Sequence, residues 1–249
     1  RNVALDLEKN PNYWMKDKDG VQLPYLDKLV FKPIAGGPDR LTALQGGAIN
    51  AMHTTLYDNF AAVAKEPAKF NMSADTEGHR EIGYGMLNLA KPPFDDLEIR
   101  KALGQALDRD RLNKISNDGK FKIANGPFDS EVMGYLPDLE GPKYDPEAAK
   151  AALAGKNLSF NLTYATDPNT KKLAQEVQRE MGQVGVKVDI ADLDQATLIT
   201  KALGGEFNLI LWRNHPGSDP DTQYLWFYSN SPVNFSKLED PELDKLWDE

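Results

Sequence analysis

Three polar residues in the last fifth of the chain have types and spacing that could support acid–base chemistry. Asp219 and Asp221 are carboxylates two residues apart, and His215 precedes the first of them by four residues. Such a group could serve a hydrolase, and the two carboxylates could also bind Ca²⁺. An Asp-Pro-Asp turn accounts for the same residues without any chemistry, because Asp side chains readily accept nearby backbone N–H groups.

The rest of the sequence offers these residues no catalytic partner. The other histidines, His53 and His79, are distant in sequence and lack a neighbour at metal-ligand spacing. The chain contains no G-x-S-x-G, no phosphate-binding Gly loop and no H-E-x-x-H. We therefore expect no enzyme, no metal site and no cofactor, and we favour binding without chemistry.

The stretch that carries these residues, 212–235, is unusually aromatic. It holds two Trp, two Tyr and two Phe, and Pro216, Gly217, Pro220 and Pro232 exclude an uninterrupted helix. The rings could cap the end of a hydrophobic core. Alternatively they could form the wall of a ligand site, since loops carry binding residues and aromatic rings line pockets.

The elements that position this stretch follow a β-α-β-α-β pattern. Strands are predicted at 158–166, 186–193 and 207–212, and helices at 169–185 and 195–205. In open sheets of this kind, ligands bind beyond the carboxyl ends of the strands. Because the aromatic stretch begins where the last strand ends, the pattern favours the ligand-wall interpretation.

Earlier elements are predicted from the same periodicities. A strand at 26–34, a helix from residue 38 that closes at Gly46 and Gly47, and a short strand at 48–50 predict a parallel β-α-β unit. A strand is predicted at 81–89, a surface loop at 117–143, and a short helix at 145–155 that begins at Asp145 and Pro146. A long helix is predicted at 95–116, capped by Asp95 or Asp96. Its apolar stripe comprises Leu97, Ile99, Leu103, Ala106, Leu107 and Leu112.

Composition excludes several classes of partner and site. The chain of 249 residues has a net charge of -9 and no cysteine. An acidic chain does not neutralise phosphates, so nucleic acids and anionic lipid surfaces are not expected partners. The absence of cysteine excludes disulfides and thiolate metal sites. The sequence begins without a signal peptide, so either the protein is not exported or its leader lies outside this chain.

Several stretches, taken in order, carry a family resemblance: "NPNYW" (10–14), "PYLDKLVFKPI" (24–34), "NLAKPPFDDLEIRKALGQALDRDRL" (88–112), "GPF" (126–128), "YDPEAAKAAL" (144–153) and "SPVNFSKLEDPELDKL" (231–246). They resemble bacterial extracellular solute-binding proteins of family 5, the peptide-binding type of receptor for ABC importers. The resemblance covers nearly the whole chain.

The resemblance implies an α/β fold of the type II periplasmic-binding-protein clamp, with the second lobe largely present and the first lobe incomplete. Residues 1–83 would belong to lobe 1, residues 84–89 would form a hinge strand, and residues 90–249 would form a C-terminally truncated lobe 2. On this basis we expect a fragment in which the strand at 26–34 has lost sheet neighbours, so that Leu29 and Phe31 are partly uncovered.

The resemblance also implies which residues bind the ligand. In this family the loop after the final strand of lobe 2 lines the cleft between the lobes, and Trp212 matches its Trp. Peptide-binding members anchor the α-amino group of the peptide with an Asp three residues later, where this chain has His215. A histidine is a poor partner for an ammonium group because it can itself be positive. The residues expected to bind the ligand are Tyr84, Asn88, Trp212, Arg213, Asn214, His215 and Asp219.

The function implied is that of an extracytoplasmic receptor that captures a peptide-like solute between its lobes and delivers it to the ABC permease. Its location would be the periplasm or the outer face of the cytoplasmic membrane, with membrane contact only through the permease or an N-terminal anchor missing from this chain. Alternative ligands are an oligosaccharide or an opine-like compound. A hydrolase that uses Asp219, Asp221 or His215, and a regulatory or chaperone-like role, are the alternative functions.

Overall fold

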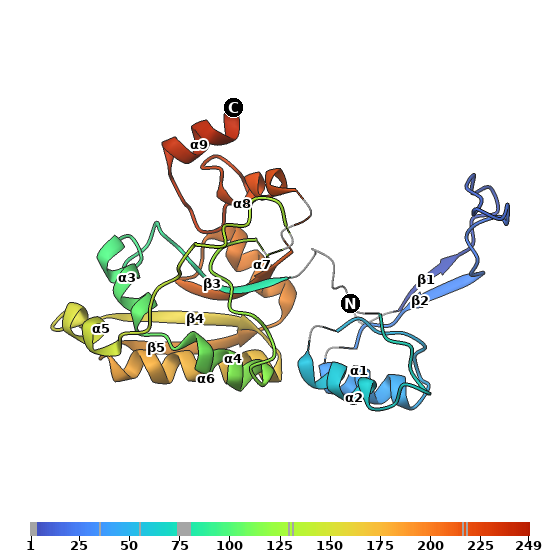
Figure 1. Cartoon of the computed structure of the whole chain (residues 1–249), viewed down its shortest axis with the longest axis horizontal. Helices are drawn as coiled ribbons and strands as arrows, with labels where there is room; N and C mark the ends of the chain where they lie inside the picture. The colour runs from blue at the N-terminus through green and yellow to red at the C-terminus, as the bar shows by residue number, and fades with distance from the viewer. Residues whose placement is uncertain are drawn as a thin grey trace. The chain divides into compact units, whose positions relative to one another are not determined.

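The computed structural model describes residues 4–34, 36–54, 56–73, 81–128, 130, 132–215, 217 and 219–249. The chain divides into two compact units, Arg1–Thr55 and Leu56–Glu249. The larger unit contains the elements that lead to the aromatic stretch (Figure 1).

In the described part of the smaller unit, a two-stranded antiparallel ribbon is followed by a helix. Strand β1 (Leu5–Glu8) pairs with β2 (Lys28–Phe31), and helix α1 (Gly37–Gln45) follows. The register sets Leu5 opposite Phe31 and Leu7 opposite Leu29, so one face of the ribbon is apolar. Leu29 and Phe31 are 43% and 53% exposed, as we expected.

The parallel β-α-β unit predicted for residues 26–50 is wrong. Strand β2 pairs antiparallel with β1, and residues 48–50 form no strand. The backbone N–H groups of Ala48 and Ile49 both donate to the carbonyl of Ala43, which folds the chain back over the end of α1. N–H groups committed to the helix end cannot pair in a sheet.

The larger unit is an α/β domain. Its strands are β3 (Ile82–Leu87), β4 (Ser159–Ala165), β5 (Lys187–Leu193) and β6 (Leu209–Asn214). Its helices are α2 (Tyr57–Ala64), α3 (Leu97–Gln105), α4 (Arg109–Asn117), α5 (Pro146–Leu153), α6 (Pro168–Gln183), α7 (Gln195–Gly204), the 3-10 turn η1 (Pro220–Gln223), α8 (Tyr224–Phe227) and α9 (Pro241–Asp248). The predicted β-α-β-α-β pattern is confirmed by β4, α6, β5, α7 and β6.

The four strands form one sheet in the order β3-β6-β4-β5. Strand β4 is parallel to both β5 and β6, whereas β3 is antiparallel to β6. The chain therefore passes from β4 to β5 on one side and returns through α7 to β6 on the other side of β4. A reversal of this kind opens a crevice at the carboxyl ends of the two strands on either side of it.

Each face of the sheet has its own hydrophobic core, because successive strand residues point to opposite faces. One core comprises residues such as Phe160, Leu162 and Val188 together with α3, α5 and α6. The other comprises Met86 and Ile210 together with α7 and Phe235. Figure 1 shows α6 against the sheet on the opposite side from α7. The aromatic stretch begins over the second core.

The single helix predicted at 95–116 is wrong, since α3 and α4 are separate helices. Asp96 caps α3, as predicted, by accepting from the backbone N–H groups of Glu98 and Ile99. Asp108 then caps α4 by accepting from the N–H of Arg111 at 2.9 Å. Leu97 is 52% exposed and lies outside the apolar stripe, whereas the other predicted members of the stripe are buried or packed against the first core.

A buried carboxylate explains why the helix breaks at this point. The backbone N–H of Asp108 donates to Glu180 Oε2 at 3.0 Å, and Glu180 is 1% exposed. Burial raises the pKa of Glu180, while ion pairs with Arg179 and Arg111 partly compensate for its charge. Glu180 of α6 therefore uses an N–H at the start of α4 that a continuous helix would have kept for itself.

Candidate functional site

Four of the predicted ligand-binding residues lie together at the carboxyl ends of β4 and β6, where sheets of this topology form a crevice. Trp212, Arg213 and Asn214 are the last three residues of β6, and Tyr84 of β3 lies directly opposite Trp212 in the register. Residues opposite each other in an antiparallel pair share a face of the sheet. Tyr84 and Trp212 both pack, partly buried, against the second core.

The ring of Trp212 belongs to an aromatic cluster with Trp226 and Phe235. Its centroid lies 5.7 Å from that of Phe235 in a T-shaped contact and 6.4 Å from that of Trp226. Trp226 in turn contacts Phe235 edge-to-face at 5.5 Å. Phe235 is 5% exposed, whereas Trp212 and Trp226 are only partly buried. The aromatic stretch therefore covers the core and also leaves part of these two Trp residues accessible.

Tyr84 contributes a phenol at the margin of the same cluster. Burial raises the pKa of Tyr84 to about 12. Its hydroxyl group consequently keeps its proton across the physiological pH range and can donate a hydrogen bond.

Two polar side chains at the end of β6 are held by neighbours. Arg213 Nη1 lies 3.2 Å from Glu81 Oε2, in an ion pair whose two side chains are both accessible to solvent. The Asn214 side-chain amide donates to Gln223 Oε1 at 3.2 Å, and Gln223 is 2% exposed. Asn214 thereby fixes η1 against the end of β6, whereas the guanidinium of Arg213 remains accessible.

His215 and Asp219 lie in the connection that follows, in the roles expected of turn residues. Asp219 caps η1, because its carboxylate accepts from the N–H of Asp221 at 3.0 Å. His215 Nδ1 accepts from the N–H of Gly217 at 3.2 Å. Within the described ranges, no three His, Cys, Asp or Glu side chains are grouped closely enough to hold a metal ion. His79 lies outside the described residues.

Asn88, the remaining predicted residue, is not brought together with the others. It follows the carboxyl end of β3, which pairs with the beginning of β6 and not with its end. The side chain is 1% exposed, and its Nδ2 donates to the carbonyls of Gly205 and Phe207, at 3.1 Å each. Its Oδ1 accepts from the N–H of Ala90 at 3.2 Å. These bonds use the amide to hold the connection between α7 and β6.

Residues 1–235 match the family described as bacterial extracellular solute-binding proteins, family 5 Middle. The chain belongs to this family. The matched range includes the crevice and the whole aromatic stretch.

Relatives in the family extend the comparison. The chain is 32% identical to the probable di/tripeptide-binding protein 5 of Pseudomonas aeruginosa over 64% of its own length and 32% of the relative. It is 26% identical to di/tripeptide-binding protein 1 of the same organism over 99% of its own length and 47% of the relative. The chain thus spans at most about half the length of these relatives.

A solved structure gives the same fold. The periplasmic binding protein DppA from Helicobacter pylori, in complex with the peptide STSA, superposes with a TM-score of 0.87 at 23% identity. The match covers 99% of this chain and 48% of that one. This chain accordingly has part of the type II clamp fold that we expected. Among the described helices, none has both the length and the apolar character needed to cross a membrane.

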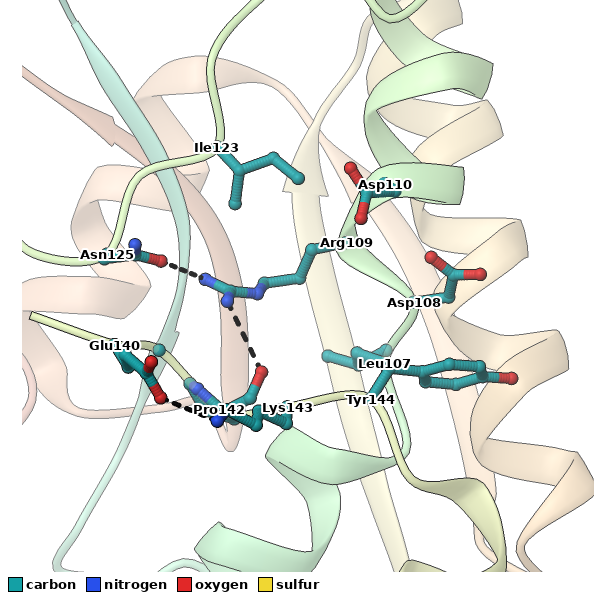
Figure 2. A pocket seen from close by; sticks show the side chains of 11 residues that line it. Leu107, Asp108, Arg109, Asp110, Ile123, Asn125, Glu140, Pro142, Lys143 and Tyr144 are labelled. Atoms are coloured by element: carbon teal, nitrogen blue, oxygen red, sulfur yellow. Dashed lines mark hydrogen bonds and ion pairs between the residues drawn. The ribbon is translucent and has the colours of Figure 1, made fainter.

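The larger unit of this chain also has a cavity that the sequence did not predict. It has a volume of about 330 Å³ and lies beside the start of α4 (Figure 2). The side chain of Arg109 extends across it, and the guanidinium donates to the carbonyls of Ala124 and Pro142 and to Asn125 Oδ1, at 3.0 to 3.3 Å. A Cβ at Gly141 would lie 2.5 Å from the guanidinium nitrogens, so a side chain at this position would displace the guanidinium of Arg109. In the sequence, Gly141 is a lone glycine in a loop, and such a glycine does not by itself indicate a cavity or a bound Arg side chain.

Proposed function

We propose that residues 1–249 form the ligand-binding middle part of an extracytoplasmic receptor that delivers a peptide-like solute to an ABC permease. Family membership over residues 1–235 supports a solute-binding role. The relatives named for di- and tripeptides favour a peptide among the possible solutes. The observation that carries the proposal is that the partly buried Trp212 lies beside Tyr84 at the carboxyl end of β6, the edge where ligands bind in sheets of this topology.

We assign residues 1–83 to one lobe, residues 84–89 to a hinge strand and residues 90–249 to the second lobe. In a clamp of this kind, ligand bound to one lobe favours closure of the other over it, because the closed form makes additional contacts. The closed form would then be the species that docks on the permease.

Within the crevice, each group has a distinct chemical use. Trp212 offers a ring face for stacking, Tyr84 offers a hydroxyl donor, and Arg213 offers a planar guanidinium that suits a carboxylate. The carboxylate end of a peptide would therefore fit at Arg213. His215 and Asp219 would shape the rim of the site through the turn that they form. We assign no catalytic step to these residues.

Calorimetric titration of short peptides into the natural gene product that carries residues 1–249 tests the proposal. We expect Trp212→Ala to weaken binding about tenfold, since loss of an aromatic contact costs up to about 1.5 kcal/mol. The matched control is Trp14→Ala in the smaller unit, where the ring is 80% exposed and should be neutral.

Two results would contradict the proposal. Wild-type affinity in Trp212→Ala, with unchanged thermal stability, would remove Trp212 from the site. Mass spectrometry that shows sugars but never peptides among co-purified ligands would replace the peptide by a different solute. Hydrolysis products in the same samples would revive the enzyme alternative.

A further inference from the structure

The long connection between α4 and α5 touches the candidate site. A Cβ added to Gly134 in this connection would lie 3.1 Å from Cγ of Pro220, the first residue of η1. Figure 1 shows the connection passing beside α8, which directly follows η1. Gly134 has a φ of +88°, and an added Cβ would also lie 3.5 Å from the ring of Phe128. Both the backbone conformation and the close neighbours therefore favour glycine at this position.

Both ends of the connection are bonded to one residue at the start of α4. Arg109 binds the carbonyl of Ala124 and the side chain of Asn125 on one side, and the carbonyl of Pro142 on the other. Figure 2 shows the bonds to Asn125 and Pro142. One guanidinium thereby ties both ends of the connection to the start of α4. Charge-assisted bonds of this kind are stronger than neutral ones.

Between these fixed points, the connection presents apolar side chains to solvent. Val132 is 5% exposed and anchors the chain, and its carbonyl accepts from the N–H of Tyr135. Met133 is 66% exposed and Leu136 is 62% exposed. Exposed apolar groups on a pinned backbone beside a crevice suit a ligand surface, and Met adapts well to varied apolar shapes.

We propose that this connection is a second wall of the ligand site and that Met133 selects peptides with an apolar side chain. The inference rests on the proposed function and adds its substrate preference. A peptide bound beside Trp212 and Arg213 would place one side chain toward η1 and the residues packed on it. Met133 is 66% exposed and directly precedes Gly134, where an added Cβ would lie 3.1 Å from Pro220 of η1.

The test is a series of tripeptides titrated into the natural gene product. Gly-Gly-Gly is the reference, and Leu-Gly-Gly, Gly-Leu-Gly and Gly-Gly-Leu place one apolar side chain at each position. We expect one Leu peptide to bind better than the reference. In Met133→Ser, the ratio of these two affinities should fall about fivefold, since roughly half of a Met side chain loses its apolar contact.

Two matched variants separate the wall from general effects. Leu203→Ser alters an apolar side chain that is 52% exposed near the end of α7 and should leave the affinity ratio unchanged. Gly134→Ala should displace the wall and lower the ratio. Gly185→Ala should not, because Gly185 has a similar φ of +84° but an added Cβ there meets nothing within 4 Å.

The possible results distinguish failure of this inference from failure of the proposed function. If wild-type protein binds none of the tripeptides or any other peptide, the proposed function fails and the inference fails with it. If wild type binds peptides but the ratio is unchanged in Met133→Ser and Gly134→Ala, only the second wall is refuted. Equal changes in Leu203→Ser or Gly185→Ala would also refute it.

Discussion

Replacement of Asn88 by alanine decides between a structural role and a ligand-binding role for this residue. The side chain is 1% exposed and makes three hydrogen bonds, to the carbonyls of Gly205 and Phe207 and from the N–H of Ala90. A hydrogen bond contributes about 0.5–1.5 kcal/mol net, and a buried group left without a partner costs more. We therefore expect Asn88→Ala to lower the free energy of unfolding by about 3 kcal/mol.

For a domain of this size, that loss corresponds to a fall in Tm of about 6–12 °C. The measurement is thermal and urea unfolding of the natural gene product, followed by circular dichroism, together with peptide titration at a temperature well below the transition. Asn161→Ala is the matched control, because Asn161 lies on β4 with its side chain exposed. Its stability should stay within about 0.5 kcal/mol of wild type.

The reasoning predicts a loss of stability without a specific loss of affinity. If the free energy of unfolding of Asn88→Ala stayed within about 1 kcal/mol of wild type, the hydrogen bonds of the Asn88 side chain would not be what holds the connection between α7 and β6. If such a variant also bound peptide at least tenfold more weakly, Asn88 would be a ligand-binding residue, as the sequence indicated.

Three further predictions concern charge and capping. The hydrogen bond from Arg179 holds the pKa of Glu176 at about 2, below its usual 4.5, so this stabilisation is complete above about pH 4.5 and is lost as the pH falls toward 2. In acid unfolding curves, Glu176→Gln should therefore lower the free energy of unfolding by about 1–2 kcal/mol at pH 7 and by little at pH 2. The loss is modest because solvent screens the partly exposed Arg partners. The control is Glu98→Gln, which breaks the exposed ion pair of Glu98 with Lys101. If Glu98→Gln changed the pH dependence of stability as much as Glu176→Gln, the role assigned to Glu176 would be contradicted. Asp96→Ala should cost about 1 kcal/mol in urea unfolding, since it removes the cap of α3, and an unchanged midpoint would refute the capping role. Burial raises the pKa of Tyr84 to about 12, so stability should fall as the pH rises from about 10 to 12, and Tyr84→Phe should remove that part of the decline in alkaline unfolding.

Local pattern was sufficient to predict much of the larger unit. The strands and helices from 158 to 214 have strong periodicity, and caps such as Asp145 and Asp96 use side-chain chemistry that acts within three residues. The break at Asp108 was missed because its cause, Glu180, lies 72 residues away in sequence. Strand β1 (Leu5–Glu8) was missed because four alternating residues are too short a signal without their partner strand.

In the candidate site, too, the features set by local sequence could be predicted, whereas those set by distant residues could not. The end of β6 could be placed from sequence because topology fixes where a parallel strand ends. The pairing of Tyr84 with Trp212 required the register of β3, and the burial of Asn88 required its contacts with Gly205 and Phe207. The contact of Gly134 with Pro220 joins two connections with no periodic pattern, so nothing in the sequence pointed to it.

The sheet order has a consequence for how the domain assembles. Strands β4 and β5 pair across a separation of about 28 residues, as for Ser159 and Lys187, whereas Ile82 of β3 meets Asn214 of β6 across about 130. Closing the longer loop costs roughly 1.4 kcal/mol more in chain entropy. Strand β3 therefore stays unpaired until β6, far along the sequence, joins the sheet. The part of the sheet that carries Trp212 and Tyr84 is thus expected to form after the pairing of β4 with β5.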